Sequence, residues 1–235
     1  MKRIFCAHRG VSALMPENTL PAFSAALALG ADEIEFDIRL TKDKKLVISH
    51  DDNLERISDG KGYICDYTMD ELRNLNIGLK HGWEIGFCEA KEVFELLANK
   101  IVFNMHVKES GEDGYLIKEL AKLVKEYNAK DNCYFAAVPP QLEDMQKYAP
   151  EIERCAIQHP DYPDVWDDAP KYGCSRVQFW YGMFEQKHID FLHGKNIGCN
   201  VFFADTYENY KMYFDMGMDT ILTNRIDLAA KFRAK

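Results

Sequence analysis

Eight short apolar runs recur along the chain, and each is followed, directly or after an insertion, by a stretch with apolar residues at helical spacing. Alternation of this kind predicts parallel strands joined by crossover helices. The expected strands cover 4–8, 33–38, 101–108, 133–138, 154–158, 176–179, 197–203 and 220–223. The expected helices cover 20–29, 91–99, 115–127, 141–148, 164–171, 185–193, 207–215 and 228–233.

Eight strand–helix units indicate an α/β protein with a (β/α)8 TIM barrel, a fold that typically needs about 250 residues. The chain has 235 residues, and a doubly wound open sheet is the competing fold. No linker or low-complexity segment interrupts it, so we expect a single domain over 1–235. Residues 51–89 are rich in turn formers, and we interpret them as a short insertion after the second strand that covers the C-terminal face of the barrel.

One strand-like run, 46–50, lies outside this alternation. The polar segment before it, 41–45, is too short for a parallel crossover, which needs about a dozen residues or more. We therefore expect an antiparallel hairpin. A turn centred between Asp43 and Lys44 would place His50 opposite Asp37.

Two strands carry polar side chains on one face only. On the second strand, Glu33, Glu35 and Asp37 alternate with apolar residues, and on the third, His106 and Lys108 do the same. Since the apolar face of a barrel strand meets the helices, the polar face is expected to point inward. Buried carboxylates are costly unless cations lie between them. The pattern predicts a polar cluster at the C-terminal end of the barrel, where barrel active sites lie.

Two histidines, close carboxylates and a lysine suit the hydrolysis of a phosphodiester. The carboxylates would hold a hard divalent cation that neutralises phosphate oxygens. One of His8 and His50 would remove a proton from the nucleophile, and the other would protonate the leaving alcohol. Arg9 and Lys108 would pair with the non-bridging oxygens. The structural alternatives are hydrogen-bonded core histidines and a salt-bridged strand.

Several short segments resemble a known family in their order and spacing. They are His8-Arg9-Gly10, Pro16-Glu17-Asn18-Thr19, Glu35-Phe36-Asp37 and His50-Asp51. Together they are similar to the glycerophosphodiester phosphodiesterases. The later segment 217–224 resembles that family's closing strand, so the similarity spans nearly the whole chain.

The resemblance implies a phospholipase-C-like phosphodiesterase barrel, one divalent metal ion, and substrates in which glycerol phosphate is esterified to a small alcohol. By position it implies the catalytic pair His8 and His50, the substrate-binding residues Arg9, Glu17 and Lys108, and the metal ligands Glu35 and Asp37. His106 stands where the family usually has a glutamate ligand, and we include it as a metal ligand. Mg²⁺ or Ca²⁺ is expected, with Mn²⁺ or Zn²⁺ also open because imidazole prefers softer ions.

Two alternatives to this function stay open. A related phosphodiesterase acting on lysophospholipids would need an apolar groove, and the aromatic candidates for it are Tyr63, Trp83, Phe87, Trp180 and Phe184. A catalytically weak barrel would bind phosphorylated ligands without turning them over. The departure at His106 favours that alternative, and the presence of both His8 and His50 opposes it.

Charge and composition exclude other classes of function. The net charge of -9 argues against a nucleic-acid partner, which needs clustered Lys and Arg. No apolar run approaches the roughly twenty residues of a membrane span, and the polar start leaves no room for a signal peptide. The 7 Cys show no C-x-x-C spacing, so we expect reduced core residues in a cytoplasmic protein. The oligomeric state is left open.

Overall fold

The computed structural model describes residues 3–234, and its strands form one sheet. In chain order the strands are β1 (Ile4–His8), β2 (Glu33–Leu40), β3 (Leu46–Ile48), β4 (Val102–Val107), β5 (Cys133–Ala137), β6 (Arg154–Ile157), β7 (Arg176–Trp180), β8 (Gly198–Phe202) and β9 (Thr220–Thr223).

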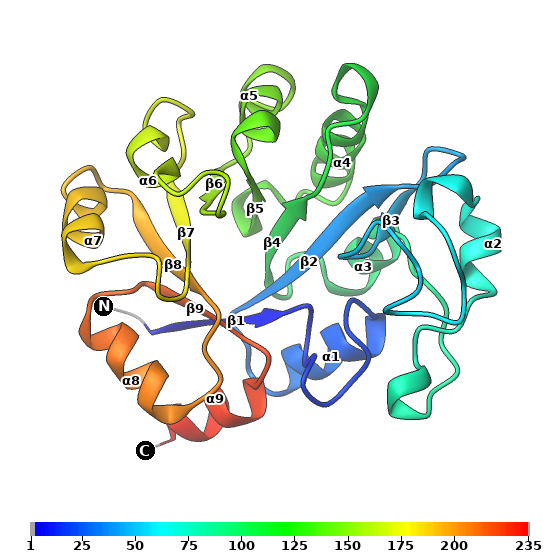
Figure 1. Ribbon diagram of the computed structural model, residues 1–235, viewed down its shortest axis with the longest axis horizontal. Coiled ribbons are helices and arrows are strands. Elements are labelled where there is room, and N and C mark those ends of the chain that lie inside the picture. The colour runs from blue at the N-terminus through cyan, green and yellow to red at the C-terminus, as the bar shows by residue number, and fades with distance from the viewer. Residues whose placement is uncertain (1–2, 235) are drawn as a thin grey trace.

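The eight strands other than β3 close into a parallel barrel (Figure 1). Their order around the ring is β1-β9-β8-β7-β6-β5-β4-β2, and β1 also pairs with β2. This last pairing excludes the open doubly wound sheet, because an open sheet has two free edges. The predicted TIM barrel is confirmed, and β3 adds to β2 in the antiparallel direction.

Helices surround the barrel and connect successive strands (Figure 1). They are α1 (Leu20–Ala28), α2 (Met69–Arg73), α3 (Ala90–Leu97), α4 (Tyr115–Glu126), α5 (Pro139–Tyr148), α6 (Val165–Asp168), α7 (Gln186–His193), α8 (Tyr207–Asp215) and α9 (Ile226–Arg233). Thr19 and Thr206 cap α1 and α8, because each side chain accepts a backbone N–H of the first turn. Such caps satisfy donors that the helix itself leaves unpaired. Within residues 3–234, no helix has both the length and the apolar character needed to span a membrane.

The strands turn their apolar side chains outward, against the helices. Phe36 of β2 and Phe103 of β4 lie 5.4 Å apart, centroid to centroid, nearly perpendicular to each other. Phe23 of α1 and Phe94 of α3 extend this row at 5.7 and 5.2 Å. Edge-to-face aromatic pairs add stabilisation beyond the area that they bury.

The interior of the barrel is correspondingly polar. Glu33 accepts a hydrogen bond from the hydroxyl of Tyr134 at 2.7 Å and lies 3.4 Å from Arg176. Asn104 donates to Gln178 across the barrel at 3.1 Å. The prediction that the polar face of β2 points inward therefore holds, but Glu33 belongs to this lower layer and not to the mouth.

The hairpin register differs from the prediction by one residue. Ile38 pairs with Ile48 and Leu40 with Leu46, so His50 does not stand opposite Asp37. The cause is the turn, in which Lys44 adopts a left-handed backbone with φ 59° and shifts the returning strand. Because β3 ends at Ile48, His50 is free of strand alternation and still reaches the mouth of the barrel.

Residues 49–89 form a small layer of their own beside β3. It contains α2 and two short 3₁₀ helices, η1 (Ile64–Asp66) and η2 (Leu79–His81). Its buried side chains Leu54, Ile64, Met69, Leu72 and Phe87 cluster together with Val47 of β3. The segment is therefore held by a compact apolar cluster and does not depend only on its contacts with the barrel.

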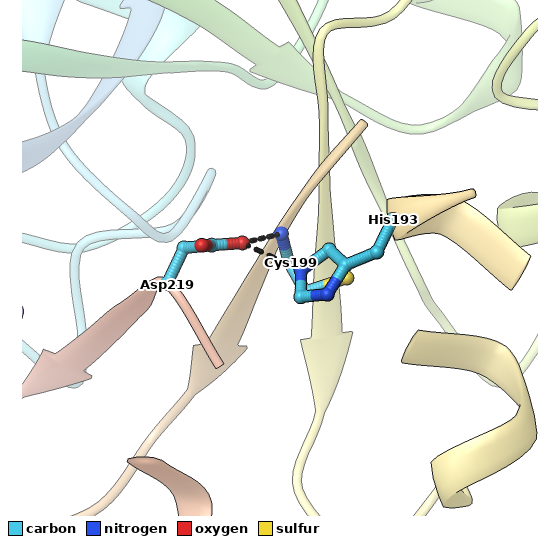
Figure 2. A group of neighbouring side chains, drawn as sticks. All are labelled: His193, Cys199 and Asp219. Carbon is cyan, nitrogen blue, oxygen red and sulfur yellow. Dashed lines mark hydrogen bonds and ion pairs between the residues drawn. The ribbon is translucent and has the colours of Figure 1, made fainter. Parts of the chain in front are cut away.

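A polar clamp joins three elements at the N-terminal end of the barrel (Figure 2). Asp219, which precedes β9, accepts the backbone N–H of Cys199 at 2.8 Å and lies 3.0 Å from the Nε2 atom of His193. Burial, followed by the charge of Asp219, raises the pKa of the Cys199 thiol to about 12. A neutral thiol beside an already satisfied carboxylate fits a structural role better than metal binding.

Removing this clamp should destabilise the protein where β8 pairs with β9. Asp219→Ala leaves the N–H of a buried strand without its acceptor, so the free energy of unfolding should fall by about 1–3 kcal/mol. The matched control is Asp215→Ala, whose partner Lys211 lies on an exposed helix surface, and it should cost about 0.5 kcal/mol or less. Urea denaturation measures both, and equal effects would contradict a specific role for the clamp.

Candidate active site

The strand register brings the predicted site residues together. His8 ends β1 and pairs with Glu35 of β2, while Asp37 of β2 pairs with His106 of β4. Side chains at paired positions of neighbouring strands point to the same face. The interior face of three adjacent strands therefore carries all four groups to one place.

The turn after β1 aims Arg9 into the same region. Arg9 has a left-handed backbone with φ 56°, and Gly10 follows with φ 82°. A side chain at Gly10 would lie 2.8 Å from the Cβ of Ala22 in α1, so only glycine fits this close approach. The backbone N–H of Arg9 donates to Glu35 at 3.0 Å, and the guanidinium lies 3.4 Å from Asp37.

One cavity of about 340 Å³ gathers seven of the eight predicted site residues. They are His8, Arg9, Glu35, Asp37, His50, His106 and Lys108. Glu17 instead lines an adjoining cavity of about 160 Å³, which also contains His50. Its carboxylate reaches the first cavity indirectly, because Arg9 donates to it at 2.9 Å.

The two carboxylates of the cavity have opposite electrostatic surroundings. Burial, followed by the charge of Asp37, raises the pKa of Glu35 to about 8. Burial alone would also raise the pKa of Asp37, but Lys108 at 3.0 Å, His106 and Arg9 together lower it. Two carboxylates this close are not both ionised easily unless a further cation lies between them.

The donor set of Glu35, Asp37 and His106 fits a divalent metal ion. One ligand atom from each residue lies within 4.8 Å of the others. The His106 Nδ1 atom is 3.1 Å from Asp37 and 3.8 Å from Glu35. Burial, followed by the charge of Lys108, lowers the pKa of His106 to about 4. Its imidazole is therefore neutral near pH 7, which is the form that binds metals.

His8 is oriented by the far end of the chain. Its Nδ1 atom lies 2.7 Å from the amide oxygen of Asn224, which also accepts the hydroxyl of Ser12 at 2.8 Å. Asp205 accepts the Asn224 amide N–H at 2.7 Å and fixes its orientation. Because an amide oxygen can only accept, we assign the proton of His8 to Nδ1, which leaves Nε2 as the proton acceptor.

His50 is held by a different kind of partner. Its Nδ1 atom lies 2.6 Å from the Asp51 carboxylate, and Arg39 donates to its backbone oxygen at 2.8 and 3.0 Å. Burial lowers the pKa of His50, although Asp37 and Asp51 act in the opposite direction. A charged carboxylate partner stabilises the imidazolium form more strongly than the neutral amide beside His8.

The wall of the cavity opposite these charged groups is mostly apolar. It contains Val138, Ile157, Trp180 and Phe202, with Gln178 and His159 as its polar members. Of the five aromatic residues predicted to line a groove, only Trp180 lies there. Phe87 lines the adjoining cavity and Phe184 packs against Phe179 in the core, while Tyr63 and Trp83 are exposed.

Sequence patterns missed the residues that hold the site residues in position. Asn18, which donates to Asp37 at 2.9 Å, and Asp51 stood in recognised segments but had no assigned role in holding other site residues. Asn224 lies 216 positions after His8 in the sequence, and Asp205 is similarly distant. No local spacing in the sequence therefore connects either residue with His8. Arg56, which donates to the carboxylates of Asp51 and Glu17, stood in a loop with no recognised pattern.

Comparison with known proteins gives a consistent result. The Glycerophosphoryl diester phosphodiesterase family profile matches residues 8–228. A glycerophosphodiester phosphodiesterase from Caldanaerobacter subterraneus subsp. tengcongensis is 30% identical over 231 residues, covering 95% of each chain. The structure of a Thermotoga maritima glycerophosphodiester phosphodiesterase has a TM-score of 0.83 at 25% identity, covering 99% of both chains. An Oleispira antarctica phosphodiesterase, solved with the product sn-glycerol-3-phosphate, shares the fold with a TM-score of 0.91 at 21% identity, covering 99% of this chain and 97% of that one.

Proposed function

The chain belongs to the glycerophosphoryl diester phosphodiesterase family, and we propose that it hydrolyses glycerophosphodiesters to glycerol 3-phosphate and an alcohol. The observation that carries this proposal is the gathering of His8 and His50, three candidate metal ligands and two cationic side chains in one cavity. Each of these groups answers a separate need of phosphodiester hydrolysis.

Glu35, Asp37 and His106 would hold one divalent metal ion. When bound, the ion supplies positive charge that stabilises the phosphate oxygens as the reaction proceeds. Arg9 and Lys108 bind the non-bridging oxygens and orient the diester. Glu17 supports binding through Arg9, whose side chain it holds at 2.9 Å.

His8 and His50 divide the proton transfers. His8 accepts a proton at Nε2 from the attacking oxygen, since burial and the charge of Arg9 lower its pKa and keep the ring neutral, while Asn224 holds the ring proton at Nδ1. His50 acts in its imidazolium form, which the carboxylate of Asp51 favours against the effect of burial, and donates its Nε2 proton to the oxygen of the departing alcohol as the bond from that oxygen to phosphorus breaks. Acid and base differ because their partners differ in charge.

The apolar wall supports a second candidate substrate class. Trp180, Phe202 and Ile157 offer no charged group to the alcohol portion of a diester. A lysophospholipid, or another diester with an apolar alcohol portion, therefore fits that side as well. Binding there would exclude water from the alcohol portion of the substrate.

We also propose a cytoplasmic location, supported by cysteines that are all free thiols.

A substrate panel tests the function directly. The purified protein should release glycerol 3-phosphate from glycerophosphodiesters, lose activity on exhaustive chelation and recover it when Mg²⁺, Ca²⁺ or Mn²⁺ is added back. Lysophospholipids in the same panel measure the second candidate. Full activity after chelation would contradict the metal-dependent mechanism, and binding of the product without any turnover would favour a ligand-binding barrel.

The histidine assignment predicts large losses of turnover. His8→Ala and His50→Ala should each lower kcat by at least about a hundredfold, the scale of a lost general acid or base. Binding of glycerol 3-phosphate should largely survive, because Arg9 and Lys108 remain. Near-native kcat in either variant would show that the corresponding histidine transfers no proton.

His106 sets the metal preference. His106→Glu adds a negative charge and a hard oxygen donor, so Mg²⁺ or Ca²⁺ should bind more tightly relative to Mn²⁺ or Zn²⁺. Isothermal titration of each ion into native and variant protein measures the change. His159→Glu is the matched control, because this residue lines the same cavity outside the donor set. Identical metal affinities in native and His106→Glu protein would show that His106 is no ligand.

A further inference from the structure

Within residues 3–234, the His50 ring makes one hydrogen bond, to the side chain of Asp51. β3 ends two residues before His50, so no strand hydrogen bonds fix this position. Arg39 holds only the backbone oxygen of His50. The imidazole itself is held by Asp51, which lies 2.6 Å from its Nδ1 atom. Whatever fixes Asp51 therefore also fixes the ring.

Asp51 is fixed by Arg56. The Nε atom of Arg56 donates to the second carboxylate oxygen of Asp51. The two terminal nitrogens of the same guanidinium donate to both oxygens of Glu17, at 3.0 and 2.7 Å. The planar fork of arginine suits this double contact, and a lysine could not reproduce it. One side chain thus bridges two carboxylates on different segments.

The electrostatics of the bridge match its geometry. Burial alone would raise the pKa of Asp51, but its hydrogen bonds with Arg56 and His50 lower it to about 2. Burial of Glu17 is likewise outweighed by Arg56 and Arg9, so its pKa is lowered. Both carboxylates are therefore ionised near neutral pH, and Arg56 supplies the charge that allows them to approach each other.

The backbone that carries Arg56 is itself well anchored. Ile57 and Ser58 donate backbone hydrogen bonds to the oxygen of Leu54 at 3.2 and 2.9 Å. Leu54 is fully buried in the apolar cluster of residues 49–89. The guanidinium is thus presented from a packed layer, although its side chain is 40% exposed.

We propose that Arg56 is the positioning residue for His50, acting through Asp51, and that residues 49–89 thereby complete the leaving-group acid. This inference rests on the proposed function. Arg56 touches neither the alcohol nor the phosphate in this role, so its removal should slow turnover without weakening substrate binding. The competing role is direct substrate binding, since Arg56 also lines the smaller cavity beside His50.

A double-mutant cycle separates these roles. Arg56→Gln should lower kcat for a glycerophosphodiester with an alkyl alcohol by at least about tenfold and leave KM within about threefold. In the His50→Ala background, Arg56→Gln should cause no further loss, because residues that act through one group are not additive. The kcat for a nitrophenyl ester should hardly fall in Arg56→Gln or in His50→Ala, since nitrophenolate leaves without a proton.

Arg73 provides the matched control. It lies in the same segment, pairs with Glu89 and Glu92 at 3.0 and 2.8 Å, and is 37% exposed. Arg73→Gln should leave kcat and its dependence on the leaving group unchanged. Arg56→Lys keeps the charge but loses the fork, and its kcat should fall between native and Arg56→Gln. Thermal melting of all three variants guards against loss of folding.

Three results would overturn the proposal. The first is a raised KM with unchanged kcat in Arg56→Gln. The second is a fall in kcat on Arg56→Gln that is as large in the His50→Ala background as in native protein. The third is an equal fall in kcat for alkyl and nitrophenyl esters. Failure of the native protein to hydrolyse any glycerophosphodiester would instead contradict the proposed function. In that case ¹⁵N spectra of the His50 ring still decide about Arg56, because the Nδ1–H form should be populated in native protein and depleted in Arg56→Gln.

Discussion

Two buried carboxylates at successive inward positions of β2 are the constraint around which the upper half of the barrel is arranged. Glu35 and Asp37 repel each other in a low-dielectric interior, and such a pair persists only beside compensating cations. Arg9 and Lys108 come from the ends of the two flanking strands, where they reach Asp37 at 3.4 and 3.0 Å. The apolar outer layer, in which Phe36 packs against Phe103, supplies the free energy that keeps these charges together.

The two histidines of the proposed mechanism are supported in different ways. His8 is a strand residue whose ring is held by Asn224, so the closure of the barrel itself orients it. His50 lies beyond the end of its strand and is held by Asp51 within residues 49–89. One proton-transfer group therefore depends on the scaffold, and the other depends on a segment added to the scaffold. Differences between relatives in that segment would then act on one half of the reaction only.

Much of this arrangement could be predicted from alternation along strands. Period-two patterning placed Asp37 and His106 on the interior face, and the strand register then paired them. The hairpin register was predicted wrongly, because the left-handed backbone at Lys44 has no residue-type signature such as glycine. The partners of the site residues, such as Asn224 and Arg56, could not be found, since long-range contacts leave no trace in the spacing of a single sequence.

The bond between His8 and Asn224 joins the first strand to the segment after the last one, across 216 positions. On a ribosome, His8 is synthesised 216 positions before Asn224. Every shorter nascent chain lacks the partner that selects the tautomer of His8. In the mechanism proposed above, the base is therefore fully oriented only once the segment after β9 has joined the ring.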